Sequence, residues 1–177
     1  MLPSVTTVLS PFADFSRVRP EVLEHAAQRG TKVHALCEAY AQGLWIPRVD
    51  EECAGYFDSF KRWFDATVSE VLAQEVELVD GKRGYMGHPD MICILKGDQV
   101  ATMIDLKTPA AKSPAWRLQL AAYWNLGKLA GYPIARSGSL RLKKDGSRAI
   151  FNEYTGSHAH DLNVFLNCLA AWKYFNQ

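Results

Sequence analysis

The sequence predicts an α/β or α+β sandwich, in which helices cover a mixed β-sheet. The hydrophobic period changes from helical to strand-like and back along the chain. The predicted elements follow the order ααβββαββα, which interleaves helices with strands. The length of 177 residues and the 48% hydrophobic content fit one globular unit. We therefore expect a single domain over residues 1–177, with its core at about 21–154 and a closing helix at 160–175.

Two amphipathic helices are predicted in the first part of the chain. The first begins after Pro20, runs to about Ala41 and ends at Gly43, because glycine commonly follows the last helical turn. Its apolar or small residues step by three and four, at positions 23, 27, 30, 33, 37 and 41. The second helix covers about residues 51–72. Its buried side consists of Tyr56, Phe57, Phe60, Trp63, Phe64 and Val71.

Three strands are predicted next, where the hydrophobic period changes from that of a helix to that of a strand. They cover residues 74–79, 87–95 and 100–107. The dipeptide Asp80-Gly81 forms a turn after the first strand, and residues 96–99 connect the second strand to the third. These strands form the first part of the expected sheet.

The last part of the chain is predicted to add a helix, a hairpin and a second helix. The first of these helices covers residues 116–130. Strands at 139–144 and 147–154 form a hairpin across Asp145-Gly146, because this dipeptide favours the tight turns that hairpins use. A helix over 160–175 closes the chain.

The charge and cysteine content exclude several classes of protein. Twenty Lys and Arg residues balance 19 Asp and Glu, for a net charge of +1, so any nucleic-acid affinity must come from a local basic patch. The four cysteines are scattered without a CxxC pair, which argues against a zinc ribbon or a thioredoxin-type site. Neither a signal peptide nor a membrane-spanning apolar run is recognisable, and we expect a reduced, intracellular, soluble protein.

The chemically informative stretch is GHPDMICILKGDQVATMIDLKT, residues 87–108. Residues two apart on a strand share a face, so Asp105 and Lys107 point the same way. If a two-residue turn or a four-residue loop joins the strands, paired residue numbers sum to 195 and Asp90 lies opposite Asp105. A three-residue loop would instead turn one of these carboxylates to the other face.

Two carboxylates that face each other in this stretch need a counter-charge. The residues around them are apolar on both faces, and burying two unpaired carboxylates would cost several kcal/mol. Raised pKa values, a basic partner or a divalent cation would each relieve this cost. Lys107 neutralises one charge, and a hard cation such as Mg²⁺ or Mn²⁺ neutralises more. A surface salt bridge between Asp105 and Lys107 is the structural alternative.

Four short motifs, in this order and spacing, resemble the RecB-like branch of the PD-(D/E)XK nucleases. They are a histidine on a helix, GHPD, IDLKT and QLAAY, and they span about residues 30–125. The residues concerned are His34, Asp90, Asp105, Lys107, Gln119 and Tyr123. The resemblance implies a restriction-endonuclease-like sandwich. In its small size and solitary core the chain is similar to phage or prophage recombination exonucleases.

The resemblance also implies a role for each motif residue. His34, Asp90, Asp105 and the backbone carbonyl of Leu106 would bind one or two Mg²⁺ or Mn²⁺ ions. Lys107 would orient or activate the attacking water and stabilise negative charge on the phosphate. The set therefore implies metal-assisted hydrolysis of a phosphodiester.

Four further side chains each have a candidate role and an alternative. Gln119 and Tyr123, one helical turn apart, would lie along the substrate strand or simply cover the sheet edge. Glu75 stands where relatives often carry a glutamate, although Glu77 has the same strand parity. Glu38, one turn beyond the motif histidine, is either a partner that holds its imidazole or a solvated residue. The histidine, without the neighbouring carboxylates, would be a hydrogen-bonded core residue.

DNA contact requires a local basic surface, because the total charge is nearly neutral. We expect Lys112, Trp116 and Arg117 to contact DNA beside the motif residues. Trp116 would stack on an unpaired base, or else pack in the core. A second basic group surrounds the predicted hairpin, where lysines also protect edge strands from aggregation.

These observations predict a metal-dependent DNA exonuclease that acts in recombination, repair or phage DNA processing. A structure-specific endonuclease of the same superfamily and a non-catalytic DNA-binding module are the alternatives. No iron–sulfur cluster is expected, because only Cys168 follows the core, whereas relatives with a cluster carry three cysteines there. The partners would be DNA and a recombination or single-strand-binding protein, with no membrane. We expect a cytoplasmic location and a bacterial or phage origin.

Overall fold

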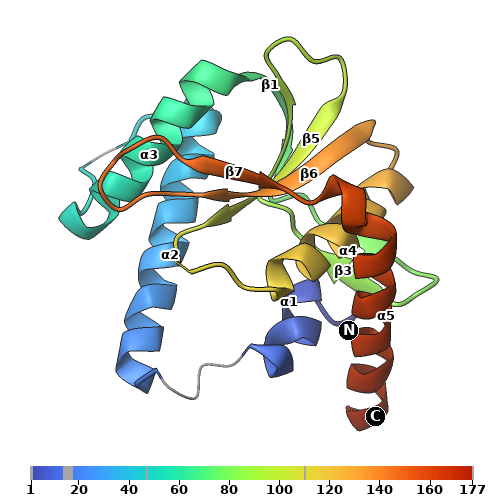
Figure 1. The fold of residues 1–177 in the computed structure, drawn as a ribbon. Coiled ribbons are helices and arrows are strands. Elements are labelled where there is room, and N and C mark those ends of the chain that lie inside the picture. Colours follow the sequence, from blue (N-terminus) through green and yellow to red (C-terminus); the bar gives the residue numbers. More distant parts are fainter. Residues whose placement is uncertain (1, 14–17, 47, 110, 177) are drawn as a thin grey trace.

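A five-stranded mixed β-sheet lies at the centre of the protein (Figure 1). The computed structural model describes residues 2–13, 18–46, 48–109 and 111–176. In spatial order the strands are β1 (Val68–Gln74), β4 (Met91–Leu95), β5 (Ala101–Lys107), β6 (Ile134–Arg141) and β7 (Ile150–Glu153). Neighbouring strands are antiparallel, except that β5 and β6 are parallel. The predicted mixed sheet covered by helices is confirmed in this form.

Helices cover both faces of the sheet and enclose a hydrophobic core on each side (Figure 1). One core lies under α2 (Pro20–Ala41) and α3 (Glu51–Thr67). The other lies under α4 (Ala115–Leu129), α5 (His158–Phe175) and the short α1 (Val5–Leu9). The sheet is thus buried on both sides over its central strands.

The central strands β4 and β5 send alternate residues into the two cores. Met91 and Ile104 pack toward α2 and α3, whereas Ile92 and Met103 pack toward α4 and α5. Alternate residues of a strand point to opposite faces, so the continuous apolar sequence of these strands supplies both cores at once. Any charged side chain at the end of such a strand has apolar groups as its immediate neighbours.

Three of the predicted helices lie close to their expected boundaries. α2 and α4 agree to within one residue, and α5 begins two residues earlier than predicted, at His158. Gly43, just beyond α2, has φ 68°, the left-handed conformation that makes glycine the usual residue at this position. None of the described helices is both long enough and apolar enough to cross a membrane.

The observed order has more elements than the predicted ααβββαββα. α1 and the 3₁₀ segments η1 (Ser10–Phe12) and η2 (Thr155–Ser157) are additional. Five strands, rather than three, stand between α3 and α4, because β2 (Leu78–Asp80) and β3 (Tyr85–Gly87) form a separate two-stranded sheet. Elements this short produce too few periodic positions to be recognised from the sequence.

The predicted helix over 51–72 is wrong at its end, since α3 stops at Thr67 and β1 begins at Val68. Val71 follows Phe64 by seven residues, which satisfies helical spacing and makes the two structures hard to separate. The β-branched valines favour a strand. Pairing with β4 supplies the backbone hydrogen bonds that decide the outcome.

The predicted strand range 139–144 begins five residues after the observed start of β6 at Ile134, and two other predicted strand ranges are wrong because each joins two separate strands. The range 74–79 crosses the end of β1 and the start of β2, with a bend at Glu75, whose φ of 45° does not fit an extended strand. The range 87–95 joins the end of β3 to β4, and the residues between them include Pro89, which has no N–H for a strand ladder. Local backbone breaks therefore divide two apparently continuous patterns.

The predicted register of β4 and β5 is correct. The pairs Met91–Ile104 and Ile94–Ala101 both sum to 195, although pairing stops before the expected turn residues. The hairpin of β6 and β7 likewise pairs Arg141 with Ile150, the register that a turn at Asp145-Gly146 produces. The β4–β5 register directs Asp90 and Asp105 to the same sheet face.

Candidate active site

Asp105 and Lys107 lie at the carboxyl end of β5, on the sheet face that α4 covers. The Lys107 Nζ lies 2.6 Å from Asp105 Oδ2. Gln119 of α4 bridges the two side chains: its Oε1 accepts a hydrogen bond from Lys107 Nζ at 2.8 Å, and its Nε2 donates to Asp105 Oδ1 at 3.1 Å. The structure thus brings together three of the residues that the sequence motifs single out.

Asp90 stands directly before β4 and lies beside His34 of α2. The His34 Nδ1 is 3.1 Å from Asp90 Oδ1, and the N–H of Leu106 donates a hydrogen bond to Asp90 Oδ2. Hydrogen bonds from a charged group and from a backbone amide both favour the ionised carboxylate. A histidine from one side of the sheet therefore reaches a carboxylate at the strand ends.

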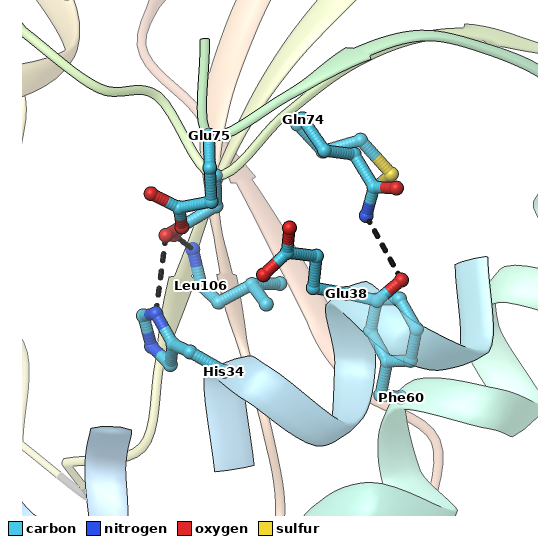
Figure 2. Close-up of a pocket in the computed structure, with 8 residues that line it drawn as sticks. His34, Glu38, Phe60, Gln74, Glu75 and Leu106 are labelled. Carbon is cyan, nitrogen blue, oxygen red and sulfur yellow. Dashed lines mark hydrogen bonds and ion pairs between the residues drawn. The ribbon is translucent and has the colours of Figure 1, made fainter. Parts of the chain in front are cut away.

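Glu75 completes a cluster with His34 and Asp90, in which one potential ligand atom from each residue lies within 4.8 Å of the others. Figure 2 shows Glu75 and His34 facing a common space, into which Glu38 also projects. Glu77 instead lies at the surface, with its carboxylate 3.6 Å from His88 Nε2. Of the two glutamates that shared strand parity, the structure brings Glu75 to the cluster, from a bend after β1 rather than from a strand.

The ionisation of these side chains reflects burial first and neighbouring charges second. Burial raises the pKa of Glu75 to about 7, and the negative charge of Asp90 adds to this. Burial also raises the pKa of Asp105, although Lys107 opposes it. For Asp90 the effect of burial is outweighed by His34, Lys107 and the Leu106 amide, so its pKa falls below the usual range. Burial depresses the pKa of His34, but Asp90 more than compensates and the net shift is upward.

The site contains more acidic than basic side chains. Among the described residues that line the pocket, three are carboxylates, and Lys107 alone has a permanent positive charge. Within the described part of the chain, no hydrogen bond of regular geometry reaches the buried Asp105 Oδ2, whose contact with Lys107 is an ion pair. Carboxylate oxygens and an imidazole nitrogen, in a site with excess negative charge, are suitable ligands for a hard divalent cation. The sequence suggested His34, Asp90 and Asp105 as the side-chain ligands. In the structure, the compact cluster consists of His34, Asp90 and Glu75 instead.

These side chains line one pocket of about 360 Å³, called the site pocket below. Its lining residues are Ser4, Thr6, His34, Glu75, His88, Asp90, Asp105, Lys107, Gln119 and Tyr123. Sequence reasoning missed Ser4, Thr6 and His88. His88 is two residues from Asp90 in the predicted strand, and this spacing could have identified it as a residue on the same face. Ser4 and Thr6 reach the pocket only through the tertiary fold.

Three other predicted site residues lie around the motif side chains, with different contacts. Tyr123 is buried, and its hydroxyl accepts a hydrogen bond from Gln119 Nε2 at 3.2 Å. Leu106 contributes its amide N–H to Asp90, and a role for its carbonyl stays a prediction. Glu38 accepts a hydrogen bond from Gln42, and within the described residues none joins it to His34. The fold thus gives Tyr123 a role in holding Gln119.

The three predicted DNA-contacting residues occupy different environments. Lys112 is exposed near the amino end of α4. Trp116 is only 7% exposed, with its ring centre 5.7 Å from Lys107 Nζ. Arg117 forms a two-point ion pair with the buried Asp161 of α5, which engages the guanidinium that the sequence suggested for DNA. Lys112 and Trp116 therefore lie beside the site, and Arg117 links α4 to α5.

No family model matches the chain, and no curated protein matches its sequence. Among solved structures, the chain is similar to an alkaline exonuclease (LHK-Exo) from Laribacter hongkongensis. The identity is 11% and the TM-score 0.44, over 98% of this chain and 90% of that one.

Proposed function

We propose that this protein is a metal-dependent DNA exonuclease that hydrolyses phosphodiester bonds. One observation supports this most strongly: three acidic side chains converge on a single pocket in which Lys107 supplies the only permanent positive charge among the described lining residues. Of the three, only Asp105 is buried, while Asp90 is partly buried and Glu75 is exposed, but such an excess of negative charge in one pocket is still destabilising unless a cation joins it. We infer that the excess negative charge serves to bind a divalent cation.

The cluster of His34, Glu75 and Asp90, together with the neighbouring Asp105, would hold the divalent cation. When bound, the cation supplies Lewis-acid polarisation of the phosphate and acidifies water. Oxygen ligands suit Mg²⁺, and the imidazole extends the preference toward Mn²⁺. The Leu106 amide fixes the orientation of Asp90 through its hydrogen bond to Oδ2.

The contacts of Lys107 support a role for its ammonium in phosphate hydrolysis. Its ammonium is held between Asp105 at 2.6 Å and Gln119 at 2.8 Å, so it is oriented before substrate arrives. A pre-oriented positive charge stabilises negative charge that develops on the phosphate in the transition state. Gln119 is itself held by Tyr123, which makes the glutamine and tyrosine positioning residues.

DNA is the proposed substrate because the motif set resembles exonucleases that act on it, and because Lys112 and Trp116 lie beside the pocket. A cationic rim with an aromatic side chain is suited to a nucleic-acid strand. Whether free ends are required distinguishes an exonuclease from an endonuclease of the same superfamily.

The test is digestion of end-labelled linear duplex and single-stranded DNA beside a covalently closed circle, in Mn²⁺ and in Mg²⁺. We expect loss of the linear forms alone, and no loss with Lys107→Ala. Lys128→Ala is the matched control, because Lys128 is exposed and packs over Trp124 away from the site pocket. Cleavage of the circle would favour an endonuclease, and full activity of Lys107→Ala would refute the proposed site.

A further inference from the structure

A second, larger pocket adjoins the site pocket and is called the apolar pocket below. Its volume is about 750 Å³, within the range of ligand-binding pockets. Leu9 and Phe12 form one wall, Pro109 and Pro114 form part of the connection from β5 to α4, and Trp116 lies on α4. Hydrophobic and ring-shaped side chains thus dominate a cavity that the proposed hydrolysis does not yet use.

The two pockets are continuous at the catalytic lysine. Thr6, Lys107 and Gln119 line both of them. A phosphodiester held near Lys107 in the site pocket would therefore have its neighbouring nucleotide at the opening of the apolar pocket. The walls belong to α1–η1 and to the start of α4. Figure 1 shows α1 lying close to the start of α4.

The walls of the apolar pocket match the chemistry of a nucleobase. Phe12 is 57% exposed on η1, so one side of its ring is available for stacking. The Lys107 ammonium lies 5.7 Å from the ring centre of Trp116, and Lys112 is exposed at the rim. Aromatic walls with cations at their edge accept the flat apolar face of a base while the cations meet its phosphates.

We propose that the apolar pocket receives an unpaired nucleobase next to the scissile phosphate, so that the enzyme selects strands that are single-stranded at the point of cleavage. This inference rests on the proposed function. A paired base remains within the helical stack and cannot enter a side pocket without being unpaired and unstacked. Duplex DNA would then be cut only where its end opens.

The test combines Phe12→Ala with single-stranded oligonucleotides that lack one base. Abasic sites are introduced in turn at each of the few nucleotides on either side of the first scissile phosphate. We expect one position at which base removal raises KM by at least about fivefold, the lower limit for stacking on an aromatic side chain. Phe12→Ala should raise KM for the intact strand to a similar extent, with kcat nearly unchanged.

The decisive comparison is the double change. If Phe12 stacks on that base, Phe12→Ala has no further effect on the abasic strand, because the two changes remove one interaction. Phe12→Tyr should restore the wild-type KM. Phe175→Ala is the matched control, since Phe175 is 81% exposed on α5 and remote from the apolar pocket in sequence and in its contacts.

Two outcomes would overturn the inference. These are an equal effect of Phe12→Ala on intact and abasic strands, and the absence of any sensitive position. The same series is read by fluorescence anisotropy in EDTA, which reports binding without cleavage. Base-dependent binding that needs Phe12, without any cleavage in Mn²⁺, would refute the hydrolysis and support the pocket. Cleavage without base dependence would support the hydrolysis and refute the role of the apolar pocket.

Discussion

Two of the buried carboxylates in the described part of the chain, Asp161 and Asp105, have different partners. At the contact of α4 with α5, Asp161 is 3% exposed, receives two hydrogen bonds from the Arg117 guanidinium and accepts another from the Ser157 hydroxyl. In the site pocket, Asp105 is equally buried and pairs with Lys107, but the pocket also contains two other carboxylates, and Lys107 has the only permanent positive charge among its described lining residues. The first carboxylate is fully neutralised by its arginine, whereas the second belongs to a group of three carboxylates with one lysine.

The difference indicates which carboxylate serves the fold and which serves a ligand. A two-point pair with arginine satisfies both carboxylate oxygens and fixes the geometry of two helices. An under-neutralised carboxylate destabilises the fold, and proteins retain such groups where function requires them. The comparison predicts opposite consequences for the same Asp→Asn change in the two regions.

The largest expected effect is on catalysis. Asp105→Asn should reduce the rate of DNA cleavage by about 10³-fold or more, because it removes a proposed cation ligand and the partner that orients Lys107. Asp161→Asn should leave the rate within a few-fold of wild type at temperatures where it stays folded. Single-turnover digestion in Mn²⁺ measures both. Similar losses in the two variants would remove the distinction between the regions.

The next largest effect concerns metal binding without substrate. Mn²⁺ at about 100 times its Kd should stabilise the wild type by about 2.7 kcal/mol, since it binds only the folded state. Thermal melts with and without EDTA measure the shift in Tm. Asp90→Asn should abolish the shift, whereas Asp161→Asn should retain it. A shift that persists in Asp90→Asn would place the ion elsewhere.

The central strands show how much of the site could be predicted from the sequence. The period-2 pattern and the short connection determined the 195 register, and with it the shared face of Asp90 and Asp105. The DxK spacing likewise predicted that Asp105 and Lys107 point the same way. These features depend on local geometry, in which residues two apart share a face regardless of the remaining fold.

Other parts of the site depend on backbone breaks and on distant segments. Glu75 was a candidate by resemblance, but strand parity could not separate it from Glu77, because it reaches the cluster through a bend after β1 with φ of 45° that no composition signal marks in a glutamate. Ser4 and Thr6 enter the site pocket only because α1 packs beside α4, a contact between segments about 110 residues apart. The sequence does not reveal the ion pair of Arg117 with Asp161, because the two residues belong to different helices that meet only in the folded protein.

The comparison also predicts opposite effects on stability in the absence of metal. Asp161→Asn should lower the free energy of unfolding by about 2 kcal/mol, because it leaves Arg117 and Ser157 without their buried charged acceptor. Asp105→Asn should raise it, since burial raises the pKa of Asp105 and its ionised form destabilises the fold at neutral pH. Urea unfolding in EDTA measures both, and a loss of stability in Asp105→Asn would contradict the argument.

The smallest effect is the pH dependence that Glu75 contributes. Its pKa rises from 4.5 unfolded to about 7 folded, so its favourable contribution is complete below pH 4.5 and is lost as the pH rises through 7. In EDTA, Glu75→Gln should match the wild type at pH 4.5 and exceed it by about 1 kcal/mol above pH 7, a value reduced for solvent screening of a partly exposed group. Thermal melts across this range isolate the effect as a difference between the two proteins.

Mn²⁺ should reverse the sign of this stability difference at pH 7.5, because the ionised glutamate then binds the ion. A constant difference between the two proteins at all pH values would mean that folding leaves the pKa of Glu75 unchanged, and it would contradict the argument from the excess charge of the site.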